Sequence, residues 1–317
     1  MRIRFLLFLL ISTIFLGCNQ GSKSKDYVTI ATLKGPSAMG MIKLIDSLNH
    51  TSDKRIRVEI LNEPIQVRKM VIDGTADFAI LPTTMAAILY NRGIDYQLAA
   101  IPVWGTLYLF GTDTTITAWN MLRGKTINLM GKGMTPDVLF KHLLIENGIN
   151  PDVDVRLDYR FPTHIDLANA VAAGQAKLGV ISEPLVSLVM ERNSKIKAIF
   201  DLNAEWQKVM DMPIAQTAFL VKGELANANK ELVDRILKSY DYSTQWVNQN
   251  PDSAAHLIVK YDILPSVEVA RKSIPRSNLY FSRVRSIRME IESYLNVFYQ
   301  MNPDIVGGRL PDENFYQ

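Results

Sequence analysis

Four short segments combine glycine or proline with hydroxyl or charged side chains, and each falls where a predicted strand passes into a predicted helix. They are residues 35–38 (Gly35, Pro36, Ser37, Ala38), 81–84 (Leu81, Pro82, Thr83, Thr84), 131–135 (Gly131, Lys132, Gly133, Met134, Thr135) and 182–184 (Ser182, Glu183, Pro184). The first turn of a helix presents unpaired backbone N–H groups and partial positive charge, which suits an anion. In α/β sheets, ligands bind beyond the carboxyl ends of the strands, where helices begin. The pattern therefore predicts a small-molecule site lined by these four turns.

Each turn also has a purely structural interpretation. Ser37 and Thr84 can serve only as helix caps, and the glycines of the third turn can serve only its backbone geometry. Glu183 can face a ligand amine, or it can instead interact with the dipole of the helix that follows it. At the level of sequence both interpretations stay open for each turn.

Aromatic side chains near the same region are further candidates for the site. Trp104 and Tyr108 lie beside a predicted crossing between two lobes, and Phe161 follows a predicted strand. Aromatic walls are common in small-molecule pockets, although packing into the core is the alternative for Trp104 and Phe161. Together with the charge of Lys132, these residues favour an anionic organic ligand. The remaining tryptophans are expected to pack against other elements: Trp119, Trp206 and Trp246.

Metal and catalytic chemistry have little support in the chain. The four histidines are widely separated, and the pair His142 and Glu146, four residues apart, is more typical of a solvated helix face than of a metal site. A single cysteine excludes an internal disulfide, a CxxC zinc site and a cysteine nucleophile in the folded body. No GxSxG motif, P-loop or GxGxxG motif after a strand occurs. We therefore expect a binding protein without metal or cofactor rather than an enzyme.

The N-terminus is typical of an exported protein. Arg2 and Arg4 precede the apolar run 5–16, whose twelve residues are too few to span a bilayer as a helix. Gly17-Cys18 ends this run and resembles a bacterial lipobox, with Phe15 where leucine is usual. The sequence predicts a signal peptide over 1–17, lipid attachment at Cys18, a tether over 18–26, and a protein anchored to a membrane and facing the periplasm or the cell exterior.

The composition is that of an ordinary globular protein. Of 317 residues, 48% are hydrophobic and 21% are charged. The formal net charge is +3, and removal of residues 1–17 loses two arginines and no acid, which leaves +1. Because the basic residues are scattered, no nucleic-acid partner is expected.

Strand-like and helical segments alternate through the first two thirds of the chain, which indicates an α/β fold with largely parallel sheets. The pattern restarts near residue 120, and from Asn227 onward it is almost wholly helical. We therefore expect two lobes joined by crossings near 108–113 and 214–220, with a single large sheet as the alternative. The predicted boundaries are 27–110 for the first part of lobe 1, 111–215 for lobe 2, and 216–317 for the return strand and the helical tail of lobe 1.

Several segments, in the same order along nearly all of the mature chain, resemble the nitrate/sulfonate/taurine type of binding proteins of ABC importers, a group that also includes binding proteins for thiamine precursors. The segments are 33–37 (LKGPS), 73–81 (DGTADFAIL), 122–127 (LRGKTI), 143–149 (LLIENGI), 173–184 (AGQAKLGVISEP) and 250–255 (NPDSAA). One departure is Lys177, where the family often has aspartate.

The resemblance implies a type II periplasmic-binding fold whose two lobes close on a small ligand. It also implies an ABC permease with its ATPase as partner, and we expect the protein to be a monomer. A ligand sensor for a membrane signalling partner is an alternative that the sequence does not separate from transport. An enzyme on the same fold is a further alternative, but the cysteine-rich iron-binding segment of the related thiamine-pyrimidine synthases is missing from this sequence.

Overall fold

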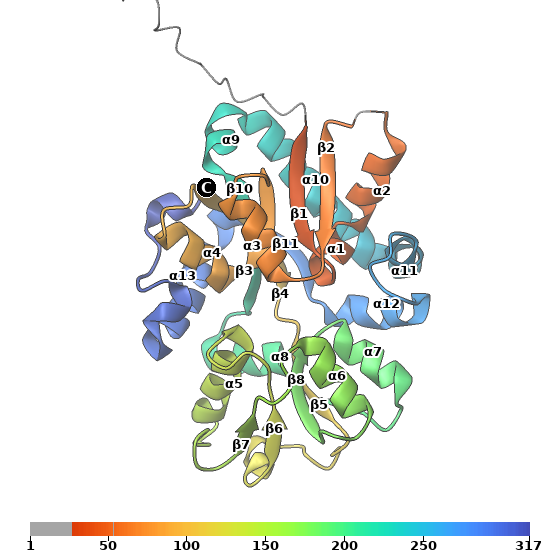
Figure 1. The fold of residues 1–317 in the computed structure, drawn as a ribbon, viewed down its shortest axis with the longest axis vertical. Coiled ribbons are helices and arrows are strands. Elements are labelled where there is room, and N and C mark those ends of the chain that lie inside the picture. Colours follow the sequence, from red (N-terminus) through yellow and green to blue (C-terminus); the bar gives the residue numbers. More distant parts are fainter. Residues whose placement is uncertain (1–26, 53) are drawn as a thin grey trace, which may run out of the picture.

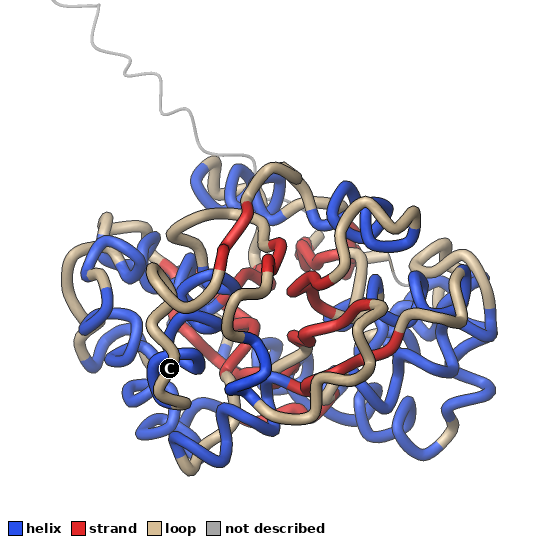
Figure 2. Tube along the Cα trace, turned by 90° about the horizontal axis from the view of Figure 1, so that it is seen from below, coloured by secondary structure: helices blue, strands red, loops and turns tan. Residues whose placement is uncertain are grey.

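The protein folds into two α/β lobes, one above the other in Figure 1. The structure is a computed structural model that describes residues 27–52 and 54–317. The predicted signal peptide and Cys18 lie outside these residues. Each lobe is built on its own sheet, and Figure 2 views the molecule from the side of lobe 2, with strands in the middle and helices around them.

Lobe 1 contains a six-stranded sheet of order β11-β4-β10-β3-β1-β2. Its first part comprises β1 (Val28–Leu33), α1 (Pro36–Gly40), α2 (Ile42–His50), β2 (Ile56–Leu61), α3 (Pro64–Ile72), β3 (Phe78–Pro82), α4 (Thr83–Asn91) and β4 (Tyr96–Trp104). Its second part comprises β10 (Ala215–Lys222), α9 (Gly223–Ala228), α10 (Lys230–Gln249), α11 (Pro251–Lys260), α12 (Val267–Ser273), the 3-10 helix η2 (Ile274–Arg276), β11 (Leu279–Arg283), α13 (Val284–Met301), and the 3-10 helices η3 (Pro303–Val306) and η4 (Glu313–Phe315).

Lobe 2 contains a five-stranded sheet of order β7-β6-β8-β5-β9. Its elements are β5 (Leu107–Gly111), the 3-10 helix η1 (Trp119–Leu122), β6 (Thr126–Asn128), α5 (Thr135–Glu146), β7 (Arg156–Asp158), α6 (His164–Ala172), β8 (Leu178–Ser182), α7 (Leu185–Arg192), β9 (Lys197–Asp201) and α8 (Leu202–Met210). Strand–helix alternation therefore predicted both α/β modules in the correct order.

Both sheets are mixed rather than largely parallel. β1 pairs with β2 and β3 in parallel, but β10 runs antiparallel to β3 and β4, and β11 runs antiparallel to β4. In lobe 2, β6 is parallel to β7 and β8, whereas β5 is antiparallel to β8 and β9. Of the strands that run against their neighbours, β5 and β10 each enter a lobe directly from the other one, so the crossing chain arrives at the end of the sheet where the parallel strands finish. β11 is instead an edge strand contributed by the tail.

The first crossing lies at Gly105-Thr106 and not near 108–113 as expected, because residues 107–111 form β5 inside the second sheet. Residues 101–110 are buried without interruption, so no change in polarity marks the passage between lobes. At Gly105 the backbone φ is +23°, and a Cβ there would lie 2.2 Å from Asn203 Oδ1 of α8. Only glycine fits this close approach, which fixes the turn of the chain between the lobes.

The tail from Asn227 onward is mostly helical, as expected, and contains one strand that the sequence did not predict. Residues 279–283 form β11, which pairs with β4 at the edge of the first sheet. Asn278 precedes it with a φ of +42°, a left-handed conformation that asparagine tolerates. Because β11 is only five residues long and is followed directly by the 18-residue amphipathic helix α13, its strand pattern is hidden within the helical one.

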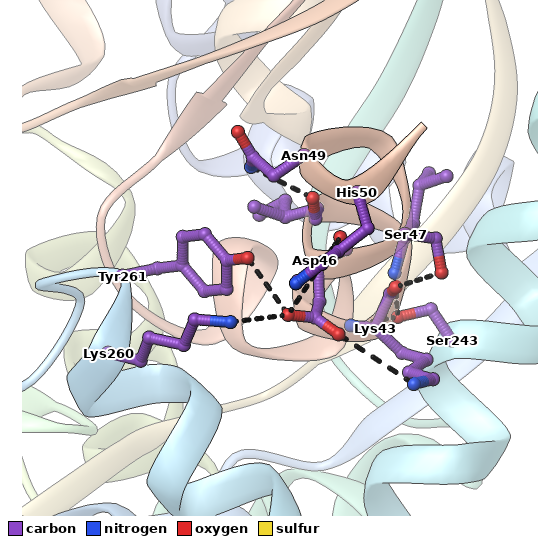
Figure 3. Close-up of polar contacts among 10 residues, drawn as sticks. Lys43, Asp46, Ser47, Asn49, His50, Ser243, Lys260 and Tyr261 are labelled. Atoms are coloured by element: carbon purple, nitrogen blue, oxygen red, sulfur yellow. Dashed lines mark hydrogen bonds and ion pairs between the residues drawn. The ribbon is translucent and has the colours of Figure 1, made fainter. Parts of the chain in front are cut away.

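A polar cluster fastens the tail to the body of lobe 1, as Figure 3 shows. The Asp46 carboxylate of α2 accepts hydrogen bonds from Lys260 Nζ (3.0 Å) and Tyr261 Oη (2.8 Å) at the end of α11. His50 Nδ1 lies 3.6 Å from the same carboxylate, and Lys43 Nζ lies 3.8 Å from it. Partial burial alone would raise the pKa of Asp46, but these donors outweigh it and the pKa is lowered.

One apolar cluster continues from lobe 1 into lobe 2 through α8. Trp206 of α8 is fully buried, as expected for a packing residue. Its ring lies 5.3 Å from His142 of α5, and 6.0 Å and 6.5 Å from Tyr294 and Phe298 of α13. The lobes are therefore joined on this side by a packed apolar contact.

Candidate functional site

The four predicted turns meet in two pairs across the boundary between the lobes. In the first pair, Thr84 at the start of α4 in lobe 1 faces Thr135 at the start of α5 in lobe 2. Their Oγ1 atoms are 2.8 Å apart, within hydrogen-bond distance. Thr84 is buried and Thr135 is half-buried. Two helix N-termini of opposite lobes thus point at one place, where their N–H groups could share an anion.

The second pair consists of the turn before α1 and the turn before α7. A Cβ placed on Gly35 of lobe 1 would lie 3.7 Å from Pro184 Cδ of lobe 2, which is ordinary van der Waals contact. Gly35 and Ser37 are buried, and Pro36 and Ser182 are half-buried. The lobes therefore approach each other closely at this pair as well, so both pairs of turns are brought together across the boundary.

The third turn is organised by Asp137, a buried carboxylate that the sequence analysis did not single out. Asp137 accepts hydrogen bonds from Gly133 N (2.7 Å), Tyr159 Oη (2.6 Å) and Lys141 Nζ (3.1 Å). The N–H of Gly133 is therefore already engaged, and both glycines of the turn have positive φ, which supports the turn-geometry interpretation for them. Lys132 is exposed, with its Nζ 5.9 Å from the centre of the Tyr159 ring, and Met134 is 50% exposed.

Glu183 turns back onto its own helix. Its carboxylate accepts hydrogen bonds from Ser187 N (3.1 Å) and Ser187 Oγ (2.9 Å) in the first turn of α7. Of the two interpretations left open by the sequence, this geometry is that of an N-terminal helix charge. Glu183 is 3% exposed, and burial raises its pKa to about 7 despite the donors of Ser187 and the nearby Arg276.

Arg276 brings the tail of lobe 1 against lobe 2. Its Nη1 lies 3.7 Å from Glu183 Oε1, and its backbone carbonyl accepts a hydrogen bond from Tyr108 Oη (3.2 Å). Tyr108 Oη also lies 3.3 Å from Asp201 Oδ2 at the end of β9. Burial, first, and the two carboxylates raise the pKa of Tyr108, so its hydroxyl remains a donor at neutral pH. Tyr108 therefore belongs to a network at the boundary between the lobes.

Trp104 and Phe161 are both engaged in packing contacts. Trp104 Nε1 donates to the carbonyl of Tyr280 (2.7 Å), and its ring lines a groove of about 480 Å³ shared with Asn203 and Gln207 of α8. Phe161 is half-buried against the apolar cluster of lobe 2 that contains Tyr108. Packing, the alternative named for both residues, is the contact that the structure gives them.

The remaining predicted residues of lobe 1 are mostly engaged in the fold. Thr83 Oγ1 donates to the carbonyl of Ala215 (2.6 Å), the first residue of β10. Because residues 215–222 form β10 in the sheet of lobe 1, the second crossing lies before Ala215 and not over 214–220 as expected. Ala38 is fully buried in the core, and the carbonyl of Ser37 accepts a hydrogen bond from Tyr240 Oη (2.8 Å). Pro82, the last residue of β3, is half-buried.

Two further threonines are candidates that the sequence analysis missed. Thr32 Oγ1 and Thr217 Oγ1 are buried and have no hydrogen-bond partner among the described residues. Thr32 is the penultimate residue of β1, and Thr217 pairs with Pro82 at the end of β3. Both therefore lie near the carboxyl ends of β1 and β3, where α1 and α4 begin. Their signal in the sequence is a hydroxyl within a largely apolar, buried strand, because a buried hydroxyl is costly without a partner.

No group of three or more His, Cys, Asp or Glu side chains within 27–52 and 54–317 is arranged to hold a metal ion. His142 lies against Trp206, and its Nε2 is 3.4 Å from Met210 Sδ. Burial lowers the pKa of His142. It is therefore a packed residue and not part of the solvated helix face that its spacing with Glu146 suggested.

Two α/β lobes, joined by two crossings and touching through the N-termini of facing helices, define the class of two-lobed solute-binding proteins. Solved structures support this class. The chain is similar to an ABC transporter protein from Parabacteroides distasonis (TM-score 0.79, 26% identity, 92% of this chain and 99% of that chain). It is also similar to the periplasmic aliphatic sulphonate binding protein of Escherichia coli (TM-score 0.71, 16% identity, 91% of this chain and 93% of that chain). A further similar structure is the periplasmic nitrate-binding protein of Synechocystis (TM-score 0.62, 12% identity, 89% of this chain and 84% of that chain).

Residues 36–258 match the family model of phosphonate ABC transporter periplasmic substrate-binding proteins. The chain belongs to this family, and it is the substrate-binding component of an ABC transporter. Membership of the family implies export to the periplasm. No curated protein matches the sequence. None of the helices in the described part of the chain is both long and apolar enough to cross a membrane.

Proposed function

We propose that the protein binds a small sulfonate- or phosphonate-like anion between its lobes and delivers it to an ABC permease with its ATPase. The observation that carries this proposal is the meeting of α4 and α5, whose N-termini come within one hydrogen bond of each other at Thr84 and Thr135. Helix N-termini from both lobes offer N–H donors and partial positive charge to the same anionic group. The names of the similar solved proteins, which bind sulphonate or nitrate, agree with an oxyanion.

The capture of ligand would proceed by hinge closure. An anion between the paired turns touches both lobes only when they are together, so ligand binding favours the closed arrangement. We propose the turn residues Gly35, Ser37, Thr84 and Thr135, with the charge of Lys132 at the rim, as its surroundings. The buried hydroxyls of Thr32 and Thr217 extend this set. The protein needs no cofactor or catalytic group for this task, and we propose that it acts as a monomer.

We further propose that a lipid on Cys18 holds the protein at the membrane beside its permease. The sequence supports this, because Cys18 follows Gly17 at the end of the apolar run and is the single cysteine of the chain. A Cys18→Ser variant should be exported but recovered in the soluble fraction, whereas the unchanged protein should remain with membranes. Recovery of both proteins in the soluble fraction would exclude the anchor.

The ligand class is tested by thermal unfolding of the chain from Asn19 onward. The panel contains methanesulfonate, taurine, methylphosphonate, 2-aminoethylphosphonate and nitrate, with the neutral dimethyl sulfone as control. A ligand at about 100 times its dissociation constant adds about 2.7 kcal/mol of stability, which raises the midpoint by about 5 °C for a protein of this size. A shift with an oxyanion and none with the sulfone is expected. A shift with neutral compounds alone would exclude the proposed ligand class.

Lys132 gives a matched test within the site. Lys132→Ala should weaken binding of the responding anion by several-fold, because a charged donor near an anion contributes about 1 kcal/mol at a solvated position. Lys195→Ala removes an equally exposed lysine elsewhere on lobe 2 and should leave affinity unchanged. Equal affinities of the two variants in isothermal titration would remove Lys132 from the site.

A further inference from the structure

A second polar seam joins the lobes, between α7 of lobe 2, together with the turn before it, and α12 with η2 of lobe 1. These elements are neighbours at the right of Figure 1. Lys272 Nζ of α12 lies 2.6 Å from Glu191 Oε2 of α7. Four residues further along the tail, Arg276 lies 3.7 Å from Glu183, the residue two before α7. Two cations on one lobe thus face two carboxylates on the other.

Neutral contacts accompany the two ion pairs. Arg276 Nη1 lies 3.2 Å from Met190 Sδ, and Leu188 of α7 packs against the apolar cluster of lobe 1. Lys272 also pairs with Glu268 of its own helix at 3.2 Å, so its ammonium group lies between the two carboxylates. The seam is therefore a specific contact between two surfaces and not a single chance pair.

The two ion pairs differ in their distance from the crossing. Glu183 N donates to the carbonyl of Thr106 in the first crossing (2.9 Å), so the pair with Arg276 lies beside the hinge. Glu191 is eight residues further on, about 12 Å along a helix. A rotation of the lobes about the crossings therefore moves the outer pair, Lys272 and Glu191, much more than the inner pair.

We propose that Lys272 and Glu191 form a clasp that sets the balance between open and closed lobes before any ligand arrives. Neither is among the residues proposed to surround the ligand, so both are positioning residues for capture. The effect of the clasp on ligand affinity rests on the proposed function, but the clasp itself can be tested without ligand. Their side chains are 52% and 39% exposed, and an exposed pair is worth up to about 1 kcal/mol. Loss of the pair should therefore lower the ratio of closed to open protein by about twofold to fivefold.

The experiment measures the distance between the lobes in solution. Because the chain from Asn19 onward has no cysteine, spin labels can be placed at Ile65→Cys in lobe 1 and Ile165→Cys in lobe 2, both more than half exposed. Double electron–electron resonance then gives the populations of short and long distances. The variants are Glu191→Lys, which sets two lysines against each other, and the swap Lys272→Glu/Glu191→Lys.

The matched control reverses a similarly exposed carboxylate in an ion pair within one helix. Glu292 lies 2.6 Å from Arg288 in α13, and both side chains are a little under half exposed. The clasp predicts that Glu191→Lys raises the ratio of long to short distances by at least fivefold. The swap should restore most of the short-distance population, and Glu292→Lys should leave the ratio unchanged. A single distance common to all variants, or a swap that behaves like Glu191→Lys alone, would overturn the clasp.

Ligand titrations separate this inference from the proposed function. If an oxyanion binds, its dissociation constant should rise in Glu191→Lys by the factor by which the closed fraction falls. An unchanged dissociation constant with shifted distances would contradict the coupling of the clasp to capture. If no oxyanion binds any variant, the proposed ligand class fails, while the distances without ligand still decide whether the clasp exists.

Discussion

The hydrogen bond between Thr84 and Thr135 offers a sharp test of closure, because its two hydroxyls differ in their access to water. Thr84 is 5% exposed and Thr135 is half-buried. A neutral hydrogen bond contributes about 1 kcal/mol net, but a buried polar group left without its partner costs about 1–3 kcal/mol. Thr84→Val leaves the hydroxyl of Thr135 without its partner, but water can reach that hydroxyl. Thr135→Val leaves the buried hydroxyl of Thr84 without its partner, and water cannot replace the lost hydrogen bond. The two substitutions should therefore have unequal effects.

We expect Thr84→Val to raise the dissociation constant of the responding anion by about fivefold and Thr135→Val by tenfold or more. The double variant should bind more tightly than Thr135→Val alone, because no buried hydroxyl is then unpaired. Isothermal titration gives the dissociation constants, and stopped-flow measurement should assign most of the change to faster dissociation, as is usual for contacts of the bound state.

Thr126→Val on β6 changes an exposed threonine of lobe 2 and serves as the control. Its affinity should equal that of the unchanged protein. Strictly additive effects of the substitutions at Thr84 and Thr135 would refute the reasoning, since residues joined by a hydrogen bond must show coupling in a double-mutant cycle.

Three further predictions concern stability, each measured by urea unfolding. The pKa of Glu183 is about 7 in the folded protein against 4.5 for a free glutamate, so between these pH values the folded state keeps a proton that the unfolded chain releases. The free energy of unfolding should therefore fall by about 2 kcal/mol from pH 5 to pH 8. Glu183→Gln should abolish most of this fall. The lowered pKa of Asp46 means that its contribution is fully present above the pKa of a free aspartate, about 4, and is lost only as the pH falls through the lower folded-state value. Asp46→Asn should therefore cost about 1 kcal/mol at pH 7 and progressively less as the pH falls below about 4, and a loss that does not change with pH would contradict its role. Trp206→Ala should cost about 3–5 kcal/mol, and a loss below 1 kcal/mol would show that the joint between the lobes does not depend on this ring.

Much of the architecture could be predicted because its signals are local. Buried strands such as β3 and β8 are short apolar runs. The helix after β3 begins at Thr83 and the helix after β8 follows Pro184, so the strand–helix alternation could be recognised in the sequence. The first crossing was misplaced because the apolar run 101–110 is buried on both sides of the passage. β11 was missed because a five-residue edge strand carries less signal than the helices that flank it.

The candidate site could be predicted only in part, since it depends on contacts between distant residues. Glycine and proline residues between predicted strands and helices located the four turns. The facing ends of the two sheets bring these turns together in the folded protein. Asp137 and Arg276 could not be found in the same way. Each acts through partners 4 to 168 residues away, and a lone carboxylate or guanidinium in a helical stretch has no local signature. The structure also turned Glu183 onto its own helix, a choice of rotamer that sequence does not fix.

The contacts between the lobes are of two kinds, and the difference indicates how the protein opens. At α8 the joint is apolar: Trp206 is fully buried between His142 of α5 and two rings of α13. Separating such a contact exposes apolar surface to water, which costs several kcal/mol. At α4–α5 the contact is a hydrogen bond, and at α7–α12 ion pairs predominate beside the packing of Leu188, so water can replace most of these contacts at about 1 kcal/mol each. Opening by rotation about α8 and the two crossings therefore breaks the polar contacts, which water can replace, and keeps the apolar contact of Trp206. A ligand that adds a few charged hydrogen bonds between the paired turns is then sufficient to hold the lobes closed.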